Sequence, residues 1–150
     1  MKQQKRAKKE SLAVSAFSAL QRTANIISNE AHKTLGSHNL TVSQFGVLEA
    51  LHTLGPMYQR DLAEQILKTT GNITTVIDNL EKRDLVKRVR EMKDRRYFQV
   101  ELTPEGSKLI KKLYPAHVKR IEKIMGTLIK GEQDEFKRLC MKLDTAVPEK

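Results

Sequence analysis

Apolar residues recur with a helical period over most of the chain and with a strand period in one central segment. Residues 11–35 carry the longest helical pattern, an apolar stripe of Ala13, Phe17, Leu20, Ala24, Ile27, Ala31 and Leu35. This pattern predicts one helix of about 37 Å, which Gly36 is expected to end. A helix of this length needs a long partner surface to bury its stripe.

A second helix is predicted to begin after Thr41. Thr41 and Gln44 have the spacing of a capping box, in which each side chain bonds the backbone amide of the other residue. Leu40 can pack against Phe45 across the same turn, and the Leu-Gly-Pro sequence of residues 54–56 ends the helix. The stretch that follows is too short for more than a linker or a single strand bridge.

Two short helices come next, joined by a tight turn at residues 68–70. The first has apolar positions at Leu62, Ala63, Ile66 and Leu67. The second is capped by Thr69 or Thr70, and its apolar positions are Ile73, Val76, Ile77 and Leu80. This pairing is typical of a helix-turn-helix.

The period then changes to two. Residues 85–90 and 97–102 predict two strands, and the charged segment 91–95 predicts the loop of a hairpin between them. Within the second strand, the side chains expected to face the body of the protein are Phe98, Val100 and Leu102. A helix-turn-helix followed by a hairpin is the winged-helix arrangement, so we expect a mostly α-helical fold with a small β-hairpin wing.

Two more helices are predicted in the C-terminal third. Thr103 caps the first, with Pro104 at its first position. Pro115 is expected to bend this helix, and Gly131 is expected to break the chain after it. Its apolar stripe is Ile110, Leu113, His117, Ile121, Ile124 and Leu128. The last helix has an apolar face of Phe136, Leu139, Cys140 and Leu143.

The charge of the chain is strongly positive and unevenly distributed. The 150 residues, about one domain in length, carry 28 basic and 18 acidic side chains, a net charge of +10. The excess is +4 over residues 1–10, +5 over 82–96 and +5 over 104–130. This distribution favours a polyanionic partner, although a solvated basic surface gives the same count.

The composition also disfavours several classes of protein. A single cysteine excludes an intrachain disulfide and a cysteine-based zinc site, and the spacing of His32, His38 and His52 suggests no metal site. No apolar run of 18 residues occurs, so we expect no membrane span and a soluble, cytoplasmic protein. There is no glycine-rich phosphate loop and no nucleophile beside a base. We therefore expect neither an enzyme nor a cofactor.

From Leu40 to Gly106 the chain resembles the MarR family of bacterial winged-helix transcription regulators. The matching segments are LTVSQFGVLEAL (40–51), DLAEQI (61–66), TTGNITTVIDNLEKRDLVKR (69–88), DRR (94–96) and LTPEG (102–106). Asp84 stands where the family usually has glycine. Because Asp tolerates a left-handed backbone better than most residues, we expect the turn to be kept. The N-terminal half also lacks the reactive cysteine of the peroxide-sensing subfamily.

The resemblance implies a homodimer that binds a near-palindromic operator in double-stranded DNA, most often as a repressor. It implies a dimerisation helix within residues 1–39, a winged DNA-binding domain over 40–103 and further dimerisation helices in 104–150. In this family a small ligand, often phenolic or otherwise aromatic, commonly binds between these parts and releases the DNA; its binding residues are not predicted here. The residues themselves leave one alternative, a basic nucleoid or RNA-binding protein that does not read sequence.

The second helix of the helix-turn-helix begins with small, uncharged side chains. Short hydroxyl and amide groups can approach base edges and phosphates in a major groove, and a helix N-terminus favours phosphate. The predicted DNA-binding residues of this helix are Thr69, Thr70, Gly71, Asn72, Thr74 and Thr75. Asp78 is acidic, so we expect it to face away from the DNA backbone or to pair with a base.

The hairpin supplies a second set of predicted DNA contacts. Its cations are Arg88, Lys93, Arg95 and Arg96. Arginine at a projecting tip can enter a narrow minor groove, although a charged tip can also be merely solvated. The resemblance implies that Asp94 pairs with an arginine, here Arg96, and shapes the tip.

Both ends of the chain carry apolar stripes that a monomer has little core to cover, so we expect them to pair with a second chain. The predicted dimerisation residues are Phe17, Leu20, Ile27, Ile121, Ile124, Leu139 and Leu143. His117 and Cys140 lie on the same stripes. In such places both residue types are more often buried core or interface groups than sensors.

Overall fold

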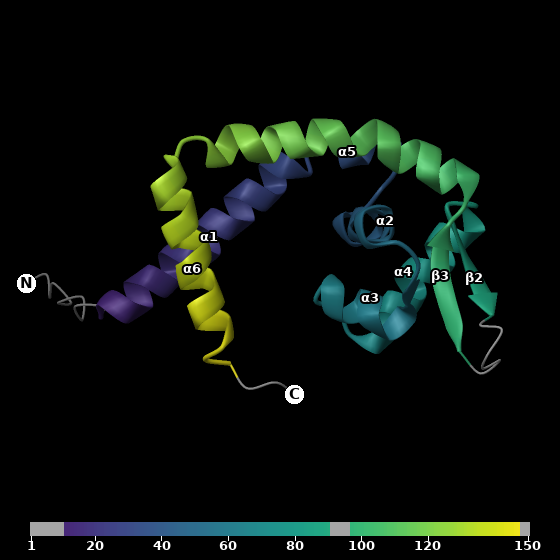
Figure 1. The fold of residues 1–150 in the computed structure, drawn as a ribbon, viewed down its shortest axis with the longest axis horizontal. Coiled ribbons are helices and arrows are strands. Elements are labelled where there is room, and N and C mark those ends of the chain that lie inside the picture. Colours follow the sequence, from purple (N-terminus) through teal and green to yellow (C-terminus); the bar gives the residue numbers. More distant parts are fainter. Residues whose placement is uncertain (1–10, 91–96, 148–150) are drawn as a thin grey trace, which may run out of the picture.

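The computed structural model describes residues 11–90 and 97–147, except for the side chain of Thr70, and it is mostly helical with a small three-stranded antiparallel sheet. Helix α5 (Pro104–Met125) runs along one side of the molecule (Figure 1). The winged part lies beneath its N-terminal half, while α1 and α6 lie at its other end. The predicted fold class is confirmed.

Helix α1 (Leu12–Ala31) is shorter than its apolar pattern suggested. The prediction that it runs to residue 35 and ends at Gly36 is wrong, because the chain turns at His32 and forms a short 3-10 helix, η1 (Leu35–His38). The turn allows Leu35, which is 5% exposed, to enter the core beneath α2 instead of continuing the stripe. Asn39, with a φ of 52°, ends this segment in a left-handed conformation.

Helix α2 (Val42–Leu54) has the predicted capping box. The Thr41 hydroxyl accepts a hydrogen bond from the Gln44 amide at 3.1 Å, and the Gln44 side chain accepts one from the Thr41 amide at 3.0 Å. The helix ends as predicted at Gly55, whose φ of 84° suits a residue without a side chain. Leu40 and Phe45 are both buried in the same apolar cluster.

The helix-turn-helix consists of α3 (Gln59–Gln65) and α4 (Thr70–Lys82), with Thr69 as the cap of α4. The buried side of α4 is the predicted one, with Ile73, Ile77 and Leu80 all fully buried. Leu67 was predicted to lie on the apolar face of α3, and that prediction is wrong. The helix ends before Leu67, where the Lys68 amide bonds the Ala63 carbonyl at 2.8 Å, and Leu67 takes a φ of 53° with 90% of its surface exposed.

The sheet has three antiparallel strands, β1 (Met57–Tyr58), β2 (Val86–Arg90) and β3 (Phe98–Leu102), in the order β1-β3-β2. Val86 and Val100 point into the core, as expected for the body-facing side. Phe98 does not follow this expectation, since 41% of it is exposed. It pairs with Arg90 at the distal end of the hairpin, and the Arg90 guanidinium lies 5.2 Å from the centre of its ring.

Helix α5 begins with the predicted cap, in which the Thr103 hydroxyl accepts from the Gly106 amide at 3.0 Å. It continues through Pro115 but ends at Met125, so the predicted end at Gly131 is wrong and Leu128 lies in the connecting turn. Gly131 instead belongs to the first turn of α6 (Lys130–Asp144). The Glu132 carboxylate accepts from the Ile129 amide at 2.9 Å and caps the helix there.

One apolar core lies in the winged part, formed by α2, α3, α4, the sheet and the first half of α5. The other end of the molecule is different. Helix α6 has no buried residue, and Ala31 is the only buried residue of α1. No helix in the described ranges is long and apolar enough to span a membrane.

Candidate nucleic-acid interface

The N-terminal end of α4 presents small, uncharged side chains to solvent. Gly71, Asn72 and Thr75 are exposed, and Thr74 is half-buried. The Thr69 hydroxyl accepts from the Asn72 amide at 3.3 Å, which fixes the start of the helix. Amides of a first helical turn point along the axis, where they can donate to a phosphate. This end of α4 can therefore approach a nucleic-acid backbone closely, and the contacts predicted for these residues stay predictions.

Arg88 does not project freely from the hairpin. Its guanidinium donates to Asp78 at 2.6 Å and to Glu81 at 2.5 Å, and its side chain is 23% exposed. Asp78 therefore faces a partner within the protein, which neither alternative offered for it had included. The two carboxylates of α4 neutralise the arginine, so the geometry favours a role in joining the wing to α4, and its DNA contact stays a prediction.

Gln59, the first residue of α3, was missed by the sequence analysis. Its side-chain nitrogen donates to the Thr74 hydroxyl at 2.6 Å, and its side-chain oxygen lies 3.5 Å from a nitrogen of Arg88. These residues are 15 and 29 positions away along the chain. No spacing rule links them, because only the packing of α3, α4 and β2 brings them together.

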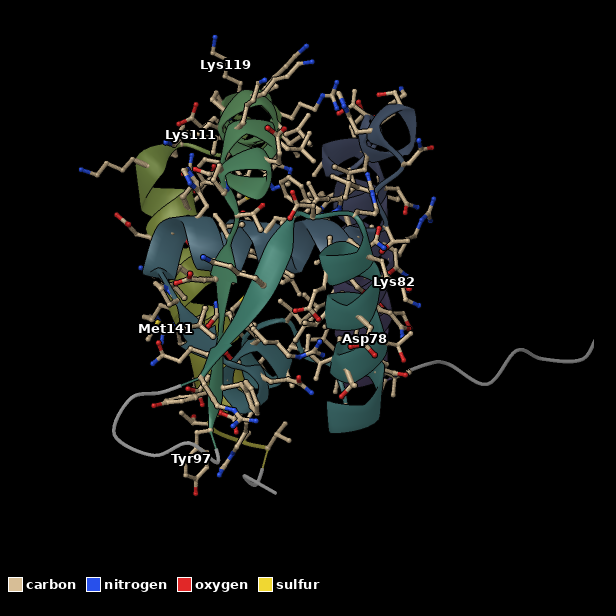
Figure 2. All side chains as sticks on the ribbon, turned by 90° about the vertical axis from the view of Figure 1, so that its right-hand side faces the viewer. Asp78, Lys82, Tyr97, Lys111, Lys119 and Met141 are labelled. Carbon is tan, nitrogen blue, oxygen red and sulfur yellow. The ribbon has the colours of Figure 1, made fainter. Side chains whose placement is uncertain are left out.

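The predicted contacts at the wing tip, Lys93, Asp94, Arg95 and Arg96, lie outside the described residues. Just beyond them, the exposed Tyr97 lies edge-on to Tyr58, with ring centres 6.2 Å apart. Figure 2 shows Tyr97 at the end of the molecule opposite Lys119 of α5, with Asp78 and Lys82 on α4. On the outer face of the sheet, Lys87 pairs with Glu101 at 2.9 Å.

The residues predicted for dimerisation form a surface that is only partly covered. Phe17 is 61% exposed, Leu139 44% and Leu143 56%, with Leu20 similar to Leu139. Ile27, Ile121 and Ile124 are half-buried. A hollow of about 800 Å³ opens between α1, α5 and α6, and its lining is largely apolar.

His117 is a buried core residue, as expected. One ring nitrogen lies 3.3 Å from the Ala31 carbonyl oxygen and the other 3.7 Å from the Glu49 carboxylate. Its ring stacks on Phe45, with centres 4.7 Å apart. Cys140 is a free, half-buried thiol. Within the part of the chain that the structure describes, no group of three histidine, cysteine or carboxylate side chains could hold a metal ion.

A second hollow, of about 690 Å³, lies where α2 meets α5 and the end of α3. It is lined by both polar and apolar groups, among them His32, Ser43, Ile66, Lys68 and Tyr114. The lining therefore offers a cation and hydroxyl groups beside aromatic and aliphatic surface, a combination suited to a small polar aromatic molecule.

Comparison with known proteins agrees with this architecture. The family profile described as "MarR family" matches residues 40–98. The uncharacterized HTH-type transcriptional regulator YkoM of Bacillus subtilis is 31% identical over 83% of this chain and 80% of its own. NadR, solved with 4-hydroxyphenylacetate, superimposes with a TM-score of 0.74 at 25% identity, over 92% of this chain and 95% of its own.

The fold is also shared with MepR of S. aureus, solved as a complex with DNA. Its TM-score is 0.77 at 19% identity, and the match covers 93% of this chain and all of that one. The winged helix, the profile match and the relationship to YkoM lead to one conclusion. The chain belongs to the MarR family, whose members are DNA-binding transcriptional regulators and not enzymes.

Proposed function

We propose that this transcriptional regulator is a homodimeric repressor that reads a near-palindromic operator and releases it on binding a small aromatic ligand. The observation that carries the DNA-reading part is the exposed, uncharged start of α4 beside a basic wing. The solved complex of MepR with DNA supports the same use of the fold.

Sequence reading falls to the first two turns of α4. Thr69, Thr70, Gly71, Asn72, Thr74 and Thr75 supply groups that bond base edges and phosphates in a major groove. On the wing, Lys93, Arg95 and Arg96 contact the flanking minor groove, with Asp94 aiming Arg96. Arg88 keeps these two elements in a fixed relation through Asp78 and Glu81.

Two features support a homodimer. The side chains at Phe17, Leu139 and Leu143 are exposed although they are apolar, and such contiguous surface usually marks an interface. The winged part already has a complete core of its own. Residues 1–39 and 104–150 thus serve mainly as dimerisation segments around a winged domain of residues 40–103, although the start of α5 also packs on that core.

Selection from a library of random duplexes tests this function. The protein is expected to enrich a near-palindrome with half-sites about one helical turn apart or a multiple of that. Competition at fixed salt should then favour this operator over bulk DNA by about 10³-fold or more. Equal affinity for all duplexes would instead support the alternative, a nucleoid or RNA-binding protein that does not read sequence.

The ligand part of the proposal rests on the hollow lined by Lys68 and Tyr114. The related NadR structure contains 4-hydroxyphenylacetate, a phenolic acid. A molecule of that chemistry could pair its carboxylate with Lys68 and pack its ring beside Tyr114. Because the hollow touches α2, α3 and α5, occupying it can favour a geometry of the winged domain that does not fit DNA.

A further inference from the structure

The side chains of Arg88, Gln59 and Thr74 form a chain of hydrogen bonds from the wing to the recognition helix. Arg88 of β2 is held by two carboxylates of α4 and reaches the oxygen of the Gln59 amide. The nitrogen of the same amide donates to the Thr74 hydroxyl at 2.6 Å. Three elements of the winged domain, β2, α3 and α4, therefore meet at a single half-buried glutamine.

The direction of each bond in this chain is fixed by chemistry. An arginine side chain can only donate, so the Gln59 oxygen must face Arg88. The Gln59 nitrogen then faces Thr74 and must donate, since an amide nitrogen has no lone pair to offer. The Thr74 oxygen is thereby an acceptor toward Gln59, and its O–H hydrogen is turned toward its other neighbours.

We infer that Gln59 is a positioning residue for sequence reading, which makes Thr74 a hydrogen-bond donor toward DNA. This inference rests on the proposed function and adds a specificity to it. In the major groove guanine, adenine and thymine all present an acceptor, whereas cytosine presents only a donor. The base that Thr74 contacts is therefore any base but cytosine, and Arg88 takes part by orienting the amide rather than by touching phosphate.

The test measures discrimination at single base pairs. The selected operator and a set of duplexes, each with one base pair replaced, are titrated with wild-type protein and with Gln59→Met, which is similar in length and adds no charge. Wild-type protein should disfavour cytosine at one position of each half-site by about five- to tenfold, the scale of one hydrogen bond. Gln59→Met should lose most of this preference and leave the other positions unchanged.

Gln59→Glu sharpens the test because a carboxylate has no proton to donate at neutral pH. The Thr74 hydroxyl must then donate to Glu and offer only lone pairs to DNA, so cytosine becomes acceptable at that position. Gln65→Met and Gln65→Glu, at the exposed end of the same helix, are the matched controls. They should keep the wild-type profile, apart from a uniform loss caused by the added charge.

A double-mutant cycle with Thr74→Val assigns the effect to the relay. Thr74→Val should remove the same base preference, and Gln59→Met should change nothing further in that background. The inference is overturned if wild-type protein discriminates between operators while the Gln59 variants leave the profile intact, or if their effect persists without the Thr74 hydroxyl. A wild-type protein with no operator preference would instead overturn the proposed function itself.

Discussion

Arg88 carries its charge where two carboxylates already neutralise it. Replacing it with alanine leaves Asp78 and Glu81 together on α4 without a cation. The pair is partly exposed, so solvent screens this loss and the free energy of unfolding should fall by only about 1–2 kcal/mol. Operator affinity should fall as well, because two uncompensated negative charges would lie beside the DNA-reading helix.

The salt dependence of binding distinguishes this role from a phosphate contact. An arginine that neutralises a phosphate contributes about 0.9 to the slope of log affinity against log salt. For Arg88→Ala, titrations at several salt concentrations should give a slope close to that of wild type. The exposed Arg90→Ala is a comparison variant on the same strand. A slope reduced by about one in Arg88→Ala would return Arg88 to the set of DNA contacts.

Residue types with strong local rules were predictable, and residues held by distant contacts were not. Asp84 has a φ of 55°, as expected for a residue in the place of a helix-ending glycine. The caps at Thr41 and Thr103 followed from spacings of three residues. Asp78 and Gln59, by contrast, have partners 10 to 29 positions away, so their roles depend on how the elements pack.

At the scale of elements, the contact between α5 and the end of α4 depends on one glycine. A Cβ atom at Gly106 would lie 1.8 Å from the Leu85 carbonyl oxygen, and backbone would have to shift to admit it. Gly106→Ala should therefore lower the free energy of unfolding by about 3 kcal/mol or more, beyond ordinary overpacking of a core. Thermal or denaturant unfolding measures this change.

Gly131→Ala is the matched control for that prediction. Gly131 also lies in the first turn of a helix, but nothing lies within 4 Å of where its Cβ would be. Alanine there should stabilise the protein by about 0.5–1 kcal/mol, because glycine is a poor helix former. If both variants were equally tolerated, the close approach of α5 to Leu85 would not exist in solution.

The existence of the helices was predictable from periodicity, whereas two of their ends were not. The apolar stripe continues past the true end of α1 because Leu35 is also buried, although in a different segment that turns into the winged core. Glycine misled in the same way at α5. Gly131 is near a break, but the turn comes before it and Glu132 caps the next helix through the Ile129 amide.

At the scale of the whole molecule, the proposed dimer depends on the partly covered surface of α1, α5 and α6. A charge at Leu20 or Leu139 would have to be buried without a partner if these helices pair with a second chain. Leu20→Glu and Leu139→Glu should therefore weaken dimerisation by at least about tenfold and weaken operator binding with it. Sedimentation over a range of protein concentrations reports the first effect.

Leu54→Glu provides the control for these variants. Leu54 is 59% exposed at the end of α2, in the winged part, and the same change there should leave the sedimentation behaviour unaltered. A wild-type protein that sediments as a monomer at micromolar concentration would contradict the dimer. It would also leave the exposed stripes of α1 and α6 in need of another partner.

The proposed ligand response couples two sites, so it can be tested from either side. If an aromatic acid lowers operator affinity by some factor, then operator DNA must lower the affinity for that acid by the same factor. Calorimetry with 4-hydroxyphenylacetate, in the presence and absence of operator, measures one side, and operator titrations with and without the acid measure the other. Lys68→Met should weaken acid binding in the absence of DNA by about tenfold, the order expected for a charge-assisted hydrogen bond.

The same substitution should leave binding of the neutral 4-methylphenol unchanged, because that molecule has no carboxylate for Lys68. Lys130→Met, on α6 and away from the hollow lining, should bind both compounds as wild type does. If Lys68→Met and wild type bind the acid equally well, the carboxylate does not lie beside Lys68. The larger apolar hollow between α1, α5 and α6 would then be the alternative site, and Ile121→Phe, which fills it, should block the ligand.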